Sequence, residues 1–432
     1  MKLKQKITDG LKNIMKGIGT EKDPRTANRF ILPTPIDFNE ANNLYSYNWL
    51  AGRIVDVPVD EATKKWRQFK IEDAEDAEKI DNAMHKYDVK GKVGTAMKWA
   101  RVFGGAVIII IIEGEDPSTP LNVATMRKGS LKNLIVLDRW QVYHDGIVFD
   151  LLANNWGKPD YYRVTRDGQK IHHSRVITFQ GATTTIQELE KNYYWGLSVF
   201  ATLREPILDR LAAFSSIGAM IFESSLDVFK IKDFNKLIAE KKDGELIKRL
   251  RYANRSKSVL NAIVMDTEDE HDKKFNSFTN LADIMDRYSQ DIAGASGIPL
   301  TKLLGITPAG LNATGESDMN NYYDMVSADI QGALAEPALK KLDPIIFKSE
   351  LDSVEIPKFE FLPLKTVTEK EKSEIELERA QKDQIYMDYD VVNKTDIQKQ
   401  LHENSTYSAL SPERIAEEEK KQQETEGFDL IG

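Results

Sequence analysis

The chain has 432 residues, more than one ordinary hydrophobic core requires, so we expect two or more subdomains. Its formal net charge of -9 argues against a protein that wraps duplex DNA tightly, because that function needs a broad cationic face. The sequence contains no cysteine, which excludes disulfides, thiolate nucleophiles and thiolate metal sites.

Residues 1–40 are predicted to form a basic N-terminal arm that ends near the turn signal Pro33-Thr34-Pro35. Its apolar residues recur at helical spacing, at Leu3, Ile7, Leu11, Ile14 and Ile18. The arm lacks the continuous apolar stretch of a signal peptide, which leaves a partner-docking arm or a membrane-surface helix as alternatives. The apolar run 107–112 is too short to span a bilayer and is typical of a buried strand. We therefore expect a soluble protein that is cytosolic when made and has no membrane partner.

Residues 41–197 are predicted to form a mixed α+β body. A helix is expected from Asp76 to Phe103, interrupted near Gly91 and Gly94, and a strand follows at Ala106–Glu113. The stretch 130–180 alternates in short apolar bursts separated by Asp-Gly turn signals, which is typical of β-hairpins.

A long helical pattern follows the body, with an apolar stripe at Leu203, Ile207, Leu208, Leu211, Phe214 and Ile217. A module of different composition comes next, and a second helix ends at Gly297-Ile298-Pro299. After a glycine-rich loop, a third helix is expected from Glu316 to Leu342. The C-terminal part is helical and highly charged, and its last residues have the composition of a mobile tail.

The sequence lacks the HExxH, Walker A and GxSxG motifs, so we predict no catalytic residue, no cofactor and no metal site. The spacing His172-x-Ser174 matches half of a two-histidine phosphoesterase site, but a second His-x-Thr/Ser is absent from the sequence. We therefore interpret His172 and His173 as a hydrogen-bonded surface pair. The acidic cluster between Asp266 and Asp272 is interpreted as a solvated turn, because lysines follow it.

The most informative stretch runs from Ile292 to Gln331 and reads IAGASGIPLTKLLGITPAGLNATGESDMNNYYDMVSADIQ. Together with Trp195-Gly196-Leu197-Ser198 at the start of the first long helix, it resembles the signature of tailed-phage portal proteins. The resemblance covers roughly residues 40–400 and implies a portal-like fold with a wing, two stem helices, an inserted clip, a tunnel loop and a helical crown. The implied parts are an N-terminal arm (1–40), a wing (41–197), stem helix 1 (198–223), a clip (224–276), stem helix 2 (277–298), a tunnel loop (299–316), a long helix with a wing strand (317–364), a crown (365–410) and a charged tail (411–432).

The tunnel-loop candidate carries no charge between Gly305 and Gly315, so it could line a channel and meet phosphate groups without trapping them. Its glycines tolerate a positive φ, which makes the backbone permissive. Thr314 or Ser317 is expected to cap the following helix, and Lys302 is the nearest cation for a weak phosphate contact. The predicted channel residues are Lys302, Gly305, Thr307, Gly310, Asn312, Thr314 and Gly315.

The clip candidate has a local positive charge, because ten basic residues face four acidic ones between Lys230 and Lys257. Charge complementarity there is expected to guide docking of a packaging motor and later of a tail adaptor, although a solvated basic face is an equally good interpretation. The predicted docking residues are Lys241, Lys242, Lys248, Arg249, Arg251 and Arg255.

The resemblance implies a non-enzymatic subunit of a ring, with twelve copies expected, at one capsid vertex in the virion. Double-stranded DNA would pass through the ring during packaging and ejection. The expected partners are the terminase large subunit, the head–tail adaptor, and the major capsid and scaffold proteins, with assembly in the host cytoplasm. Because some relatives of this portal branch are linked to phosphodiesterase domains that destroy cyclic-oligonucleotide signals, a nucleotide phosphodiesterase or nuclease is the alternative. A head-assembly adaptor is the third hypothesis.

Overall fold

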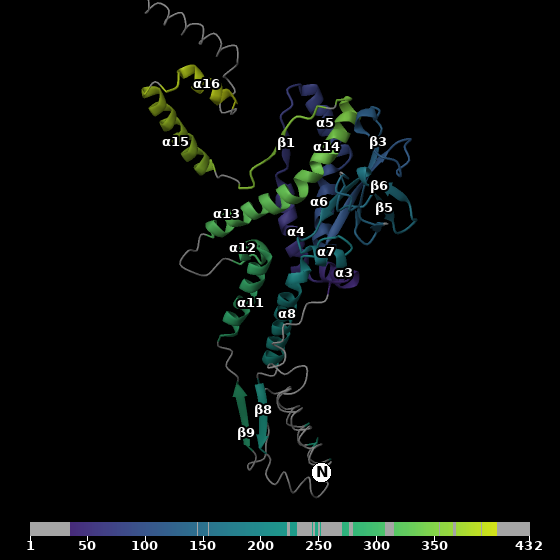
Figure 1. Cartoon of the computed structure of the whole chain (residues 1–432). Coiled ribbons are helices and arrows are strands. Elements are labelled where there is room, and N and C mark those ends of the chain that lie inside the picture. The colour runs from purple at the N-terminus through teal and green to yellow at the C-terminus, as the bar shows by residue number, and fades with distance from the viewer. Residues whose placement is uncertain are drawn as a thin grey trace, which may run out of the picture. The chain divides into compact units, whose positions relative to one another are not determined.

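The structure is a computed structural model (Figure 1). It describes residues 35–144, 146–153, 155–222, 225–230, 244, 247–248, 251, 270–275, 280–306, 315–353, 355–365, 369–389 and 391–403. The chain divides into two units, Met1–Leu364 and Lys365–Gly432. Helices and small antiparallel sheets alternate in the first unit, which confirms the expected mixed α+β class.

The centre of the first unit is a three-stranded sheet in which β2 (Gly105–Ile112) lies between β3 (Leu131–Asp138) and β7 (Val176–Gln180). Both pairings are antiparallel, with Ile109 opposite Ile135 on one side and Val176 on the other. Strand β2 is apolar on both faces and is buried at every position except Ile111, which is partly exposed. Ile108 and Ile110 belong to the main core, and Val107 and Ile109 contribute to a second core beneath the small sheets.

Four helices build up the core next to this sheet: α3 (Phe38–Tyr47), α4 (Trp49–Lys64), α5 (Ala74–Lys86) and α6 (Val89–Phe103). The expected single helix 76–103 is wrong at its break, because the chain turns at Tyr87 and Asp88 and both glycines lie within α6. Asp88 has a φ of 47°, and its carboxylate accepts a hydrogen bond from the Gly91 N–H at 3.2 Å. Gly91 is therefore part of a helix start, where a side chain would collide with the capping carboxylate.

The remaining elements of the body are short. Strands β4 (Val142–His144), β5 (Tyr161–Val164) and β6 (Lys170–His172) form one antiparallel sheet, and β1 (Arg67–Phe69) pairs with β10 (Phe359–Phe361). The 3-10 turn η1 (Val123–Thr125) lies between β2 and β3, η2 (His173–Arg175) lies between β6 and β7, and the helix α7 (Ile186–Lys191) follows β7.

Two long helices leave the body and pack against each other, α8 (Phe200–Phe222) and α11 (Leu281–Ser296) (Figure 1). The strands β8 (Ser225–Lys230) and β9 (Glu270–Phe275) pair antiparallel, with Ser225 opposite Phe275. The predicted apolar stripe of α8 is divided between two environments. Leu203 and Ile207 are buried, whereas Leu208, Leu211 and Phe214 are exposed.

A junction of glycines joins α8 to the central sheet. Backbone segments at Gly104, Gly181 and Gly196 cross in direct contact, and a Cβ on Gly196 would lie 2.7 Å from the Gly181 nitrogen. The Gly181 N–H donates to the Gly104 carbonyl at 2.9 Å, and Leu197 and Ala182 exchange two backbone hydrogen bonds. Only residues without a side chain fit this crossing, so the start of α8 is fixed to the sheet.

The helix expected to end at Leu342 continues to Leu351. It consists of α13 (Glu316–Met325), the π-helical segment η3 (Val326–Ala335) and α14 (Glu336–Leu351). Pro337, which has no N–H, was expected near the helix end but lies in the middle. The wider π-helical turn of η3 accommodates Pro337, because the Glu336 N–H donates to the Gln331 carbonyl five residues earlier. The Gln331 side chain also donates to the Ala62 carbonyl at 3.0 Å, which ties this turn to α4.

The second unit contains α15 (Glu369–Asp388) and α16 (Lys394–Glu403). The assignment of wing, stem, clip, tunnel loop and crown to these elements stays a prediction. Within the described residues, no helix combines the length and the apolar character that a bilayer span requires.

Candidate functional site

The candidate site is the loop between α11 and α13, whose two ends the structure describes. Helix α11 ends at Gly297 with a φ of 68°, and the short helix α12 (Leu300–Leu303) follows Pro299. The chain then turns at Gly305 (φ 71°) and re-enters helix at Gly315 (φ 58°). Each turn uses the left-handed conformation that glycine adopts without steric cost.

Arg53 on α4 holds the first end of the loop. Its Nε donates to the Leu303 carbonyl at 2.7 Å, and its Nη2 donates to the Lys302 carbonyl at 2.6 Å. These are carbonyls at the C-terminus of α12, which have no partner within that helix. A positive charge there also favours the helix dipole, so Arg53 fixes the point from which the loop departs.

Lys302 does not present a free positive charge to a channel. Its ammonium lies 2.7 Å from the Glu61 carboxylate, and the Glu61 side chain is only 10% exposed. The pair offsets the charge within one subunit and ties α12 to α4 a second time. A contact between Lys302 and phosphate therefore stays a prediction, and any such contact would have to compete with Glu61.

The second end of the loop rests on Tyr322 of α13, which is 1% exposed, and burial raises the pKa of its hydroxyl. Arg101 lies nearby and donates to the Ile54 carbonyl at 2.9 Å. Burial lowers the pKa of Arg101 to about 10. Tyr322 thus packs in the core and anchors α13 directly after the loop.

The expectation that Ser317 caps α13 is wrong, and the alternative cap, Thr314, lies outside the described residues. Gly315 occupies the N-cap position without a side-chain hydrogen bond, and Ser317 lies inside the helix. Glu316 and Asp318 in the first turn instead provide the negative charge that the helix N-terminus favours. The predicted loop residues Thr307, Gly310, Asn312 and Thr314 lie outside the described residues.

The predicted docking module is described only in part. The strand pair β8–β9 fixes its two ends, and Lys248 and Arg251 are exposed. Lys241, Lys242, Arg249 and Arg255 lie outside the described residues, as does most of the acidic cluster. The structure therefore leaves the docking role as a prediction.

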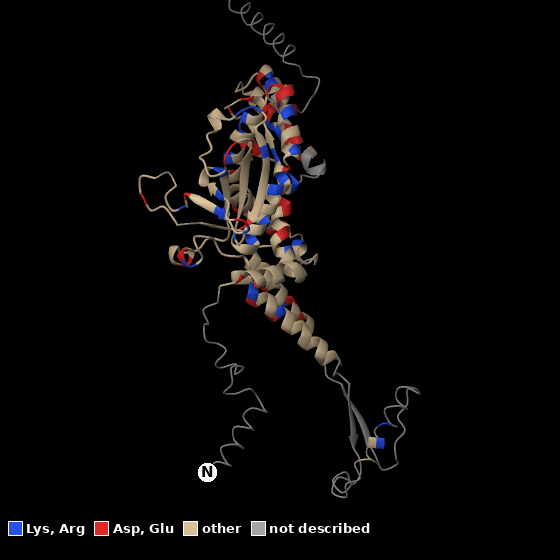
Figure 2. Ribbon diagram, turned by 90° about the vertical axis from the view of Figure 1, so that its right-hand side faces the viewer, with Lys and Arg blue, Asp and Glu red and all other residues tan. Residues whose placement is uncertain are grey.

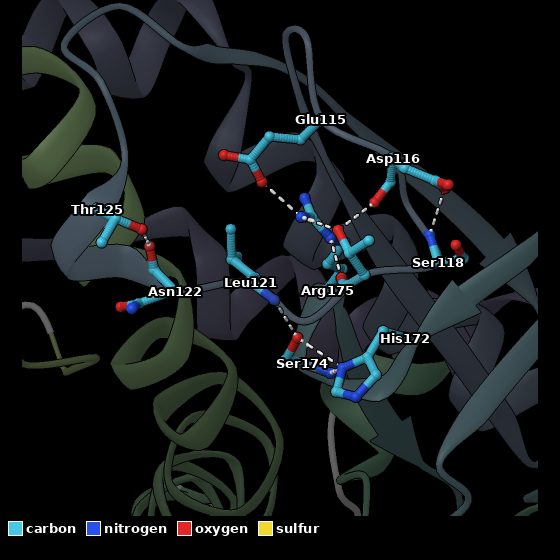
Figure 3. A network of polar contacts seen from close by, with 10 residues as sticks. Glu115, Asp116, Ser118, Leu121, Asn122, Thr125, His172, Ser174 and Arg175 are labelled. Carbon is cyan, nitrogen blue, oxygen red and sulfur yellow. Dashed lines mark hydrogen bonds and ion pairs between the residues drawn. The ribbon is translucent and has the colours of Figure 1, made fainter.

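The His172-x-Ser174 pair forms part of a turn (Figure 3). The Ser174 hydroxyl accepts a hydrogen bond from the Leu121 N–H at 2.7 Å and lies 2.8 Å from His172 Nδ1. The Ser174 N–H also donates to that nitrogen at 3.2 Å. Burial, with His173 next, lowers the pKa of His172. These bonds favour a neutral imidazole that accepts at Nδ1, and they agree with the interpretation as a hydrogen-bonded pair.

Arg175 completes this network. It is 1% exposed, its Nε donates to the Thr119 carbonyl at 2.8 Å, and its Nη2 lies 2.5 Å from the Glu115 carboxylate (Figure 3). The ion pair joins the buried Arg175 to the partly exposed Glu115 and holds the loop 115–122 against η2, which follows β6. Within the described residues, no group of three histidine or acidic side chains could hold a metal ion.

Sequence reasoning missed the residues that support the candidate loop, namely Arg53, Glu61 and Arg101. Their hydrogen bonds reach partners far along the chain, with Arg53 and Leu303 separated by 250 positions. A local pattern carries no signal for such a contact. The sequence indicated only the loop itself, as an uncharged stretch between Gly305 and Gly315 that follows Lys302.

Two relatives share much of the chain. It is 34% identical over 387 residues to "Anti-CBASS protein Acb1" of Caulobacter sp. (strain RHG1), an alignment that covers 85% of this chain and 61% of the relative. It is 30% identical over 430 residues to a protein of the same name in Sphingomonas paeninsulae, with coverages of 96% and 68%. The chain thus spans about two thirds of the length of these relatives.

The prediction that the chain is not an enzyme is wrong in view of these relatives. Both carry the name of an anti-CBASS protein, and the portal resemblance already implied a link to phosphodiesterase-bearing relatives. The sequence carries no second His-x-Thr/Ser beside His172-x-Ser174, so no catalytic motif in these 432 residues pointed to an enzyme.

Among solved structures, a chain in the neck of an empty GTA particle, computed with C6 symmetry, matches with a TM-score of 0.50. The match covers 86% of this chain and 94% of that chain at 14% identity, so it bears on the fold alone. Residues 39–385 also match the family model described as phage portal protein. This range includes the body, both long helices and both ends of the candidate loop. The chain belongs to the phage portal protein family.

Proposed function

We propose that the chain is a portal subunit, several copies of which close head to tail into a ring at one capsid vertex. The observation that carries the proposal is the uncharged loop between Gly305 and Gly315, whose first end is held by Arg53 and Glu61 of α4 and whose second end leads into the core-anchored helix α13. A loop whose ends are fixed, and whose glycines allow several backbone conformations between them, suits the lip of a channel. DNA would pass through the ring during packaging and ejection, with few and sequence-independent contacts.

The surface of α8 supports ring closure. The helix carries no charged residue between 211 and 222, as its lower half shows (Figure 2). Exposed small residues recur on the face opposite Arg210, at Ala212, Ser215 and Ala219. A neighbouring helix can approach such a face closely, and a head-to-tail interface of this kind generates a closed ring when its rotation closes.

The partners follow from the same proposal. The module between β8 and β9 would dock the terminase large subunit and later the head–tail adaptor through its basic residues, and the ring would sit against capsid and scaffold proteins. Reversing the exposed charges Lys248 and Arg251 to Glu is expected to weaken pull-down of these partners without changing ring formation. Unchanged binding by this double variant would reject the docking role.

The proposed function is tested by electron microscopy of the purified chain in negative stain. We expect rings with a central hole wide enough for duplex DNA, with twelve copies in the capsid. A uniform monomer at micromolar concentration would contradict the proposal. Rings without a central opening would contradict it equally.

A nucleotide phosphodiesterase is the second candidate, favoured by the name that the two relatives share. The test incubates the purified chain with a cyclic dinucleotide and follows loss of substrate by chromatography. Turnover that His172→Ala abolishes would support this candidate. Turnover that persists in that variant would place the activity elsewhere in the chain, and no turnover would reject the candidate for this chain.

A further inference from the structure

A strip of exposed aromatic side chains lies on the body close to the point where the described chain begins. Its members are Phe38, Trp140, Tyr193 and Phe149, with exposed fractions of 40%, 42%, 74% and 56%. Contiguous exposed apolar patches of this kind mark surfaces that another segment or molecule covers. These four residues are referred to below as the aromatic strip.

Side-chain contacts join the first half of the strip. The rings of Phe38 and Trp140 are 6.2 Å apart and steeply inclined to each other. The guanidinium carbon of Arg139 lies 4.4 Å from the centre of the Trp140 ring, and Arg139 donates to the Asn192 side chain at 2.7 Å. Because Tyr193 is the next residue after Asn192, the strip continues from α3 through the turn between β3 and β4 to the end of α7.

The second half of the strip rests on a strained pair of tyrosines. The Phe149 ring lies 5.9 Å from the ring of Tyr194, and His144 Nε2 lies 3.0 Å from the Tyr193 carbonyl. Tyr193 and Tyr194 have left-handed φ angles of 54° and 61°, which residues other than glycine adopt only at an energetic cost. The strain holds the Tyr193 ring in solvent, where it adds nothing to the core, and this indicates a role at the surface.

The sequence contains a segment that fits this strip, the basic N-terminal arm, which lies outside the described residues. The described chain begins at Pro35, three residues before Phe38. In the helix that the spacing of the arm predicts, the apolar side chains fall within about 80° of arc, at Leu3, Ile7, Leu11, Ile14 and Ile18. A helix of this length that contains Gly10 and Gly17 is marginal in water, so packing against a surface is needed to stabilise it.

The arm is long enough to reach the whole strip. The predicted helix from Leu3 to Ile18 is about 24 Å long. Residues 19–34 connect it to Pro35, and they span up to about 55 Å when fully extended. Because the arm and the strip belong to one chain, they meet at an effective concentration on the order of millimolar.

The arm and the border of the strip carry opposite charges. Residues 1–20 contain five lysines and one acidic residue, Asp9. Three exposed carboxylates lie next to members of the strip or just before them in the sequence, at Asp37, Asp150 and Glu190. Charges of opposite sign favour the approach of a helix whose lysines flank its apolar side.

We propose that the helix Leu3–Ile18 packs with its apolar side along the aromatic strip of its own chain. The strip is then an internal docking site, and the arm docks on protein and not on a membrane surface. The contact forms within one chain and does not depend on the proposed ring.

Limited trypsin digestion of the full chain tests the proposal from the side of the arm, because the arm contains lysines at which trypsin cleaves. The double variant Leu11→Ser/Ile14→Ser removes two side chains from the apolar side. Its arm is expected to be cleaved at least tenfold faster than that of the wild type. Gln5→Ser/Asn13→Ser, on the polar side, is the matched control and should be cleaved like the wild type.

The same digestion tests the proposal from the side of the strip. Phe149→Ser/Tyr193→Ser is expected to release the arm to the same degree as the arm variant. Leu362→Ser, which changes an exposed apolar residue outside the strip, is the control and should keep the arm protected. Circular dichroism checks that each variant is folded.

Equal cleavage of the wild type and of Leu11→Ser/Ile14→Ser would overturn the proposal. Slow cleavage that Phe149→Ser/Tyr193→Ser leaves unchanged would overturn it as well, because the arm would then be docked elsewhere. An arm that resists trypsin only when anionic lipid vesicles are added would identify the membrane-surface helix instead.

Crosslinking shows which copy of the chain is bound, since the chain has no cysteine of its own. Leu11→Cys/Tyr193→Cys treated with a short bismaleimide should form a link within one chain, which keeps the protein at monomer mass on a denaturing gel. Asp9→Cys/Tyr193→Cys, with nearly the same tether but on the opposite side of the helix, should react at least fivefold less. Multimers on the gel would overturn the contact within one chain and assign the strip to the arm of a neighbouring copy.

Discussion

At the scale of single residues, buried charges are the most informative feature of the body. Lys341 on α14 donates to the His173 carbonyl at 3.1 Å and to the Val176 carbonyl at 2.8 Å. Burial, with Lys158 next, lowers the pKa of Lys341 to about 8. The folded state thus holds this proton less tightly than the unfolded chain does, which makes the stability dependent on pH.

We predict that Lys341 raises the free energy of unfolding as the pH increases from about 8 to about 10.5. In this window the unfolded chain still binds the proton that the folded state has released, so folding is favoured increasingly. Urea denaturation at several pH values should show this rise in the wild type, relative to Lys341→Met. The neighbouring Lys340→Met is the control, since Lys340 is exposed and paired with Glu336. Parallel pH curves for the wild type and Lys341→Met would contradict the prediction.

The ion pair of Arg67 and Asp343 gives a second prediction. Both side chains are nearly inaccessible, and the Arg67 guanidinium also lies 4.5 Å from the rings of Phe69 and Phe359. Asp343→Asn should cost about 3–5 kcal/mol, because it leaves a buried positive charge uncompensated. The exposed pair Lys70–Glu360 is the matched comparison, and Lys70→Met should cost less than about 1 kcal/mol.

Chemical denaturation of both variants measures the difference. Similar losses of unfolding free energy in Asp343→Asn and Lys70→Met would show that the buried pair is not special.

Residues in local patterns were predictable, and residues in long-range contacts were not. The left-handed turns at Gly305 and Gly315 follow from glycine chemistry, and the loop between them carries no charge. The sequence also indicated that Lys302 was the nearest cation. Its partner Glu61 is 241 positions away, however, so only the fold reveals that its charge is offset.

At the scale of elements, the glycine junction fixes how α8 leaves the body. The existence of α8 was predictable from its helical apolar spacing, and a helix start after Trp195-Gly196 was expected. The crossing of three backbone segments was not predictable, because it brings together residues more than 70 positions apart. The break between α5 and α6 was expected at glycines, but it lies at Asp88, whose carboxylate caps α6 by a local hydrogen bond.

We predict that Gly196→Ala destabilises the fold by about 2–4 kcal/mol, since the added carbon would collide with the Gly181 backbone. Gly218→Ala, near the exposed C-terminal end of α8, meets no neighbouring atom and should stabilise the chain by up to about 1 kcal/mol. Thermal unfolding followed by circular dichroism compares the two. Equal melting temperatures would mean that the junction can relax and does not fix α8.

At the scale of the whole molecule, assembly depends on surfaces that the single chain leaves open. Leu208, Leu211 and Phe214 are each about half exposed on α8, which is unfavourable for an isolated subunit in water. The first unit has a continuous core of its own. Assembly and folding should therefore be separable by mutation.

We predict that Ala219→Arg prevents ring formation and leaves the circular dichroism spectrum and melting temperature of the subunit unchanged. The long charged side chain would stand on the small-residue face where a neighbouring helix approaches. Ala219→Ser, which keeps the residue small, should assemble like the wild type in light-scattering measurements. Rings from the Arg variant would show that this face points away from the neighbouring subunit.

The pairing of Ser225 with Phe275 has an implication for how such chains diversify. Strands in a sheet are about 4.8 Å apart. The segment between β8 and β9 therefore begins and ends at two neighbouring points of the chain. A change in the length or sequence of that segment need not alter the spacing of α8 and α11, which flank the strand pair. Under the proposed docking role, chains of this family can change their partners by exchanging this one segment, while the helices of the proposed channel stay the same.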